Sequence, residues 1–149
     1  IGSCWIAETM DWKTLARDEY NGLKLGIIIS IGYAPEKIPL KQEGIRTAIR
    51  LRTKKPEQIM TANGAQTEPV KMPEWFNRGI DAVLACPTAI NRLPVVFDLT
   101  DGVVSASMPD QRHFVQDYDL GISKLHFELA ADLKGTWELG QTGRFIVSE

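Results

Sequence analysis

An ordered series of helix and strand signals between residues 73 and 134 constrains the fold more than any other feature of the sequence. Pro73 suits the first turn of a helix, and Pro87 prevents a helix from continuing past it. Between the two prolines, apolar residues recur with the spacing of one helical face. These residues are Trp75, Phe76, Gly79, Ile80, Val83 and Leu84. The sequence therefore predicts a helix with one apolar face that ends before Pro87.

Two apolar stretches come next along the chain, at 93–99 and 103–108, and Asp101-Gly102 lies between them. An Asp-Gly pair in this position is a strong hairpin signal, because both residues tolerate the positive φ angles of a tight type I′ turn. The sequence therefore predicts two antiparallel strands.

A second helical pattern follows this hairpin. Asp117 or Asp119 is a suitable N-cap, and Gly135 is expected to end the helix after Lys134. A helix, a hairpin and another helix in this order favour an α+β fold. The apolar stripe of the second helix is expected to consist of Leu120, Leu125, Leu129 and Leu133, with Ile122 and Ala130 on its flank.

The first sixty residues carry a less complete series. Asp11 is a candidate cap for a helix over 12–20. The segment 25–33 predicts a strand that is buried on both faces, because it is rich in isoleucine and lacks polar alternation. The basic segment 41–55 has no clear periodicity and is expected to be a loop.

Shorter elements are expected around a central linker. Pro56 is expected to open a short helix that reaches Met60. An Asn-Gly pair, a proline and several polar residues make 61–72 the best linker of the chain. Short strands are expected at 137–139 and 144–147.

Composition excludes several classes of protein. With 149 residues the chain has the length of one ordinary domain, and 44% of them are hydrophobic. The sequence has no apolar run near the roughly 20 residues that a membrane helix needs, so no membrane partner is expected. Two cysteines and two histidines form neither a disulfide framework nor a metal-ligand set, and a reduced cytoplasmic location is expected. A start at Ile1 without a leader is consistent with a truncated chain and with a processed secretory domain.

The basic segment 41–55 holds six Lys or Arg residues and a single acidic residue, Glu43, although the whole chain has a net charge of −2. Such a segment is consistent with an anionic partner or with a solvated loop. A nucleic-acid module is disfavoured, because the whole chain is acidic and no aromatic residues alternate with these cations.

Five segments resemble, in order, the nitroreductase family: Gly2–Ile6, Ile29–Lys37, Arg52–Gln58, Ala85–Pro94 and Asp119–Leu129. The first is similar to a G-(S/T)-C-W-(I/L) motif, and the fourth to an A-P-S-A-x-N-x-Q-P loop. The last resembles a D-x-G-I-x-x-x-H-F-E-L helix. This combination resembles a branch in which one chain holds two half-repeats that mimic the usual nitroreductase dimer.

The resemblance implies an α+β fold with helices packed on a mainly antiparallel mixed sheet, truncated at the N-terminus. Residues 1–60 would end the first half-repeat, 61–72 would be a linker, and 73–149 would form the second half-repeat. The N-terminal portion of the same fold would be a missing partner of this chain.

The resemblance also implies a flavin enzyme that needs no side-chain nucleophile. FMN would take hydride from NADH or NADPH and reduce a nitroaromatic or quinone acceptor. The backbone N–H groups of Gly2 and Ser3 would lie beside the flavin, although the same residues could form only a tight exit into a strand. The residues expected to bind the cofactor are Gly2, Ser3, Cys4, Arg50, Arg52, Lys54, Lys55, Thr88 and Asn91.

The same residues can also be interpreted without a cofactor. The cations could belong to a solvated loop, and Thr88 and Asn91 could lie in a structural relic of the flavin loop. Leu93 replaces the usual Gln and removes one hydrogen-bonding group. Cys4 and Cys86 are expected to be small buried side chains, and His126 a core residue. A degenerate nitroreductase that binds flavin or another phosphorylated ligand is therefore the second hypothesis.

Overall fold

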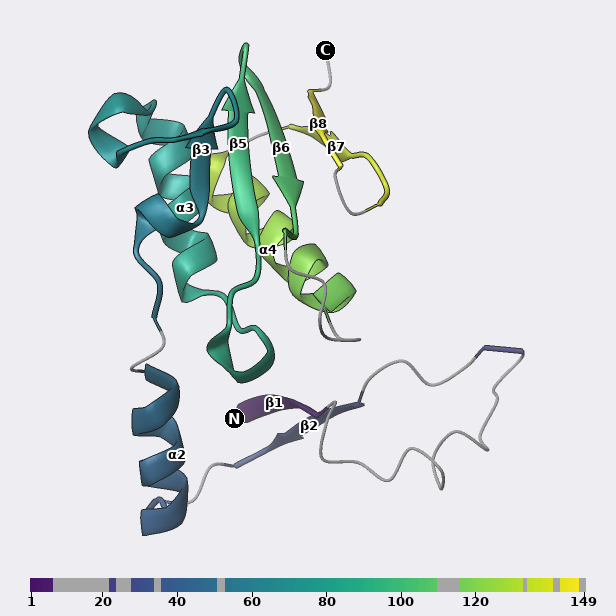
Figure 1. The fold of residues 1–149 in the computed structure, drawn as a ribbon. Coiled ribbons are helices and arrows are strands. Elements are labelled where there is room, and N and C mark those ends of the chain that lie inside the picture. Colours follow the sequence, from purple (N-terminus) through teal and green to yellow (C-terminus); the bar gives the residue numbers. More distant parts are fainter. Residues whose placement is uncertain are drawn as a thin grey trace. The chain divides into compact units, whose positions relative to one another are not determined.

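The computed structural model divides the chain into two compact units, Ile1–Glu43 and Gly44–Glu149. The boundary falls inside the helix α2, Leu40–Arg50 (Figure 1). Each unit is described by itself. The structure describes residues 1–6, 22–23, 28–33, 36–50, 53–109, 116–132, 134–140 and 143–147.

Unit 1 contains an antiparallel pair of strands, β1 (Gly2–Ile6) and β2 (Ile28–Gly32). The strand predicted at 25–33 is confirmed over the part that is described. Its predicted burial is wrong, because Ile29 is 45% exposed and Ile31 is 74% exposed. An apolar strand is buried on both faces only where other layers cover both faces, and the described part of unit 1 supplies no such layers. The helix predicted at 12–20 lies outside the described residues.

The basic segment is not the loop that the sequence predicts, because α2 occupies most of it. The carbonyl of Pro39 accepts hydrogen bonds from the N–H groups of Gln42 and Glu43 at 2.8 and 3.0 Å. Lys, Gln, Glu and Arg also lose little side-chain freedom in a helix. The early carboxylate of Glu43 suits the positive end of the helix dipole. Local propensity therefore decides this element.

Besides the end of α2, the described part of unit 2 contains a four-stranded mixed sheet, two long helices and a short hairpin near its C-terminal end (Figure 1). The strand order is β4-β3-β5-β6. The long helices are α3 (Glu74–Ala85) and α4 (Gln116–Ala131). The strands are β3 (Met60–Ala62), β4 (Ala65–Gln66), β5 (Val96–Thr100), β6 (Val103–Ser107), β7 (Gly135–Trp137) and β8 (Phe145–Val147).

Strand pairing in unit 2 is mainly antiparallel, which confirms the expected α+β class. Only β3 and β5 are parallel among the described pairs, with Met60 opposite Phe97. The hairpin of β5 and β6 turns at Asp101 and Gly102, whose φ angles of 51° and 80° are those of the predicted tight turn. The C-terminal strands pair as β7 and β8, close to their predicted positions.

The first half of the segment 61–72 belongs to the sheet, because β3 ends at Ala62 and β4 covers Ala65–Gln66. Its Asn-Gly pair forms the turn of the β3–β4 hairpin. The Asp98 carboxylate on β5 accepts hydrogen bonds from Thr61 Oγ1 at 2.6 Å and from the Gly64 N–H at 2.8 Å. A short 3-10 turn, Pro69–Lys71, then leads to α3. The half-repeat boundary expected here stays a prediction.

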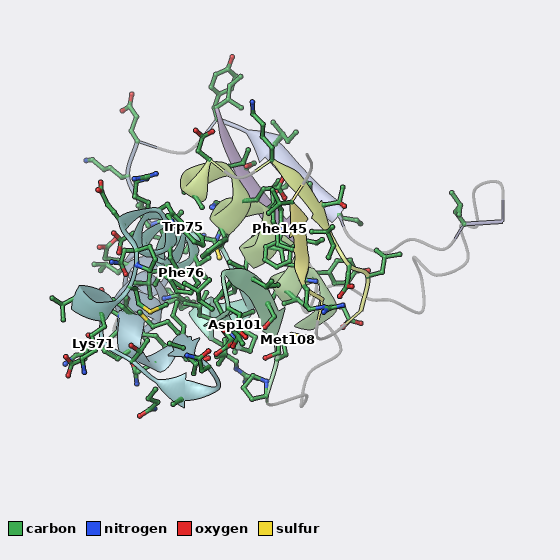
Figure 2. All side chains as sticks on the ribbon, turned by 90° about the horizontal axis from the view of Figure 1, so that it is seen from above. Lys71, Trp75, Phe76, Asp101, Met108 and Phe145 are labelled. Carbon is green, nitrogen blue, oxygen red and sulfur yellow. The ribbon has the colours of Figure 1, made fainter. Side chains whose placement is uncertain are left out.

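The core of unit 2 lies between the sheet and the helices. Phe127 of α4 stacks on Phe97 of β5, with ring centroids 4.7 Å apart, and meets Phe76 of α3 edge-on at 5.3 Å. Figure 2 shows side chains gathered between these elements, and Phe76, Met108 and Phe145 are buried there. The predicted face of α3 is confirmed, because Phe76, Gly79, Ile80 and Val83 are all buried.

The predicted apolar stripe of α4 is confirmed at Leu120, which is buried, and wrong at Leu125 and Leu129, while Leu133 lies outside the described residues. Leu125 is 54% exposed and Leu129 is 71% exposed. The helix also ends at Ala131, three residues earlier than predicted, and Asp132 takes a left-handed φ of 56°. The cause is that α4 carries two apolar faces, and packing of Phe127 against β5 selects one of them. The face so buried contains Leu120, Ser123, Lys124, Phe127 and Ala131.

Candidate functional site

The expected cofactor-binding residues are divided between the two units. Gly2, Ser3 and Cys4 lie on β1 of unit 1. The described members of the rest lie in unit 2, and Arg52 falls outside the described residues. A site that needs residues of both units stays a prediction.

The glycine segment at the N-terminus is a strand rather than a turn. Gly2 pairs with Gly32, Ser3 with Ile31, and Cys4 with Ser30. In an antiparallel ladder, successive residues direct their N–H groups alternately toward and away from the partner strand. One of the two N–H groups of Gly2 and Ser3 therefore points away from β2, toward the opposite edge of β1.

The cations predicted to bind phosphate occupy the end of α2 and the segment after it. Arg50 is the last residue of α2. Lys55 is exposed, and its N–H donates to Gln58 Oε1 at 2.8 Å, which fixes the start of the 3-10 turn Pro56–Gln58. Lys54 is half-buried, and burial lowers the pKa of its ammonium group. An anion beside Lys54 would offset this desolvation, so its position is compatible with phosphate.

The loop that resembles the flavin-binding motif is strained. It contains the 3-10 turn η3, Ala89–Asn91. Ile90, Asn91 and Leu93 have φ angles of 46°, 55° and 45°. Left-handed backbone costs a residue with a side chain about 1–2 kcal/mol, and such residues persist where surrounding contacts hold them. Strain of this kind clusters at ligand-binding positions.

Among the hydrogen bonds described for this loop, two are accepted by side-chain oxygens that hold it in place. Thr88 Oγ1 accepts a hydrogen bond from the N–H of Leu93 at 3.0 Å. Asp119 Oδ1 on α4 accepts one from the N–H of Ala89 at 2.9 Å. Asp119 is only 4% exposed. The structure thus brings together Thr88 and Asn91, whose N–H donates to the Thr88 carbonyl at 3.0 Å.

The contact between Asp119 and Ala89 was not predicted from the sequence. Asp119 was expected to cap α4, but it lies inside the helix, which already includes Gln116, and its carboxylate accepts a hydrogen bond from Ala89, thirty positions earlier. A signal was present, because Asp119 and Ser123 are polar residues four positions apart on the face that also carries Phe127. Ser123 Oγ donates to the Asp119 carbonyl at 2.8 Å. Polar groups on a buried helix face need partners, which points to such a contact.

A buried cysteine, Cys86, lies just before this loop. Cys86 Sγ lies 3.5 Å from Ser123 Oγ. Burial raises the pKa of the Cys86 thiol, so the thiol is not set up as a thiolate nucleophile. The prediction of a small buried side chain is confirmed for Cys86.

A cavity of about 430 Å³ lies between α4 and the turn after β7, and none of the expected cofactor-binding residues lines it. Its cation is Lys124, which is buried. Lys124 Nζ donates to the carbonyls of Glu138 and Gly140 at 3.3 and 3.4 Å and lies 5.2 Å from the centre of the Trp137 ring. These contacts tie α4 to the β7–β8 hairpin.

Metal and membrane sites find no support in the part of the chain that the structure describes. No cluster of His, Cys, Asp and Glu among those residues could hold a metal ion. His126 is half-buried on α4. None of the helices described is both long enough and apolar enough to cross a bilayer.

Comparison with known proteins identifies the family. The family model described as "Putative TM nitroreductase" matches residues 1–131, which is most of the chain. No curated protein and no solved structure gives a significant match. The match includes β1, the strained loop and α4. The chain belongs to this nitroreductase family, a family of oxidoreductases.

Proposed function

We propose that the chain is part of an FMN-dependent oxidoreductase that uses NADH or NADPH to reduce nitroaromatic or quinone-type acceptors. The observation that carries this proposal is the family match over residues 1–131. The strained loop at 88–93 supports it, because a tightly held loop is suited to position a flat ligand.

FMN would supply the hydride chemistry, and the protein would supply binding and polarisation. Arg50, Arg52, Lys54 and Lys55 would bind the phosphate. Guanidinium groups form paired hydrogen bonds to phosphate oxygens, and lysines add point charges. The half-buried position of Lys54 supports this role.

The remaining residues would contact the ring system. The β1 segment Gly2–Cys4 would offer a backbone N–H to the flavin edge, where negative charge grows on reduction, and the glycine would permit close approach. Thr88 and Asn91 would present polar groups from the loop in unit 2. No residue is assigned as a nucleophile or general base.

Purification of the full-length protein tests the proposal. The expected product is yellow and oxidises NADH or NADPH in the presence of a nitroaromatic or a quinone. A colourless protein that neither binds added FMN nor oxidises a nicotinamide would contradict it.

A second function is favoured by Leu93. This residue takes the place of the usual Gln, and its side chain is only 3% exposed, so it is buried rather than presented to a ligand. A degenerate nitroreductase that binds flavin, or another phosphorylated ligand, would tolerate this loss. Flavin titration separates the two functions, because binding without nicotinamide oxidation favours the degenerate protein.

We also propose a cytoplasmic location, and a further N-terminal portion of the same fold as a partner of this chain. The buried free thiol of Cys86 is consistent with a reducing compartment.

A further inference from the structure

A buried carboxylate supports the strained loop from a different element. Asp119 belongs to the first turns of α4, and its Oδ1 accepts the Ala89 N–H at 2.9 Å. Ala89 immediately precedes Ile90 and Asn91, the first two residues of this loop that have left-handed backbone. The contact therefore acts at the point where the chain enters its strained conformation.

Because Asp119 is buried, its hydrogen bond stabilises the loop more than a hydrogen bond on the surface would. A carboxylate removed from water is costly unless it accepts hydrogen bonds. At 4% exposure, Asp119 is held where a donor from the loop satisfies it. Relaxation of the loop would remove that donor, so the carboxylate and the strained backbone stabilise each other.

The opposite end of the same loop is held within the loop itself. Thr88 Oγ1 accepts the Leu93 N–H at 3.0 Å, and Leu93 is buried. The loop is thus closed by Thr88 and anchored to α4 by Asp119. Its tip carries Ile90, which is 38% exposed, and the half-buried Asn91.

We propose that Asp119 is a positioning residue that holds the 88–93 loop in its strained form and thereby sets the affinity of that loop for flavin. The effect on flavin rests on the proposed function. The effect on the loop does not, because it follows from the Asp119–Ala89 contact alone.

The negative charge near the start of α4 is a competing explanation, since any early carboxylate stabilises a helix. Asp117 provides the matched control. It lies in the same first turn and carries the same charge, but its side chain is exposed. Asp117→Asn removes that charge without touching the loop contact.

The experiment compares Asp119→Ala, Asp119→Asn and Asp117→Asn with the wild-type full chain. Amide hydrogen exchange of residues 88–93 reports the loop, and quenching of FMN fluorescence reports flavin affinity. For Asp119→Ala we expect exchange to be faster and FMN binding to be weaker, each by about tenfold or more, since hydrogen bonds to charged groups have this magnitude. Asp119→Asn keeps an acceptor oxygen and should stay within about threefold of wild type, as should Asp117→Asn.

The outcomes separate the two proposals. Unchanged exchange in Asp119→Ala, or equal effects of Asp119→Ala and Asp117→Asn, would overturn the positioning role. Loss in Asp119→Asn as large as in Asp119→Ala would overturn the acceptor role. Faster exchange with unchanged FMN affinity would overturn the link to flavin. If the wild type binds no FMN, the proposed function fails while the exchange measurement still decides the positioning role.

Thr88→Val keeps the experiment decisive if Asp119→Ala does not fold. It removes the acceptor for the Leu93 N–H and leaves the buried carboxylate in place. We expect faster amide hydrogen exchange at 88–93 in Thr88→Val. In Asp119→Asn we expect exchange to stay close to that of the wild type. Wild-type exchange in Thr88→Val would contradict a loop held by these two oxygens.

Discussion

At the scale of single residues, close approach between α3 and α4 depends on Gly79. A Cβ atom built at this position would lie 2.5 Å from Cε2 of the Phe127 ring. Phe127 in turn is enclosed by Phe76 and Phe97 and is fully buried. The ring cannot move aside without disturbing the centre of the core.

Gly79→Ala should therefore destabilise the protein by about 1–3 kcal/mol, the usual cost of overpacking a core. Urea unfolding measures the change. Gly121→Ala on α4 is the control, because no atom lies within 4 Å of its added Cβ. That variant should gain up to about 1 kcal/mol from helix propensity. Equal effects at the two positions would mean that the helices do not pack as described.

Several contacts also converge on Asp98. Burial alone would raise the pKa of its carboxyl, but hydrogen bonds from Thr100, Thr61 and the Gly64 N–H outweigh burial and lower the pKa below its ordinary 3.8. A carboxyl with a lowered pKa in the folded state adds stability above the pKa of the unfolded chain. This stability is lost as the pH falls through the folded-state pKa.

We expect the unfolding free energy of the wild type to fall between pH 5 and pH 2 more steeply than that of Asp98→Asn, because the variant has no proton to bind at this position. At neutral pH, Asp98→Asn should be less stable by about 1–3 kcal/mol, since charge-assisted hydrogen bonds are lost. Chemical denaturation at several pH values measures both effects. Parallel pH curves for the two proteins would show that Asp98 makes no such contribution.

At the scale of elements, α4 shows how packing chooses between two helix faces. Tyr118, Leu125 and Leu129 form an apolar row on the exposed side. Leu120, Phe127 and Ala131 form the buried row. Both rows repeat at helical spacing, so periodicity alone does not distinguish them. The aromatic residue decides, because only one face lets Phe127 stack on β5.

The choice of face predicts a large difference between neighbouring substitutions. Phe127→Ala should cost about 3–5 kcal/mol, as expected for a large side chain removed from a closed core. Leu125→Ala, two positions earlier, should cost less than about 1 kcal/mol because Leu125 is 54% exposed. Thermal or urea unfolding of the two variants compares them directly. A cost at Leu125 that matches the cost at Phe127 would favour the face that the sequence predicts.

Across the whole chain, the residues proposed to bind flavin are distributed over the two units. The β1 segment lies in unit 1, while Lys54, Lys55 and the strained loop lie in unit 2. The proposed phosphate-binding role of the cations can be tested by itself, because loss of charge near a bound phosphate weakens binding.

Arg52→Ala and Lys54→Ala should each weaken FMN binding by about tenfold, the usual effect of one charge-assisted hydrogen bond. Lys71→Ala is the control. Lys71 is exposed and contacts only a surface carboxylate, Glu68, at 3.9 Å among the ion pairs described. Flavin titration gives the dissociation constants. Unchanged affinity in both test variants would exclude a phosphate-binding role for these two residues.

Elements with local signals could be predicted before any packing was known. Pro73 and Pro87 bracket α3, and Asp101-Gly102 places the turn of the β5–β6 hairpin, because dihedral preferences act between neighbours in the chain. The resemblance likewise placed the chain in its family. The buried face of α4 and the contact from Asp119 to Ala89 could not be predicted in this way. Both depend on groups far apart in sequence, whose meeting is decided by packing and not by local preference.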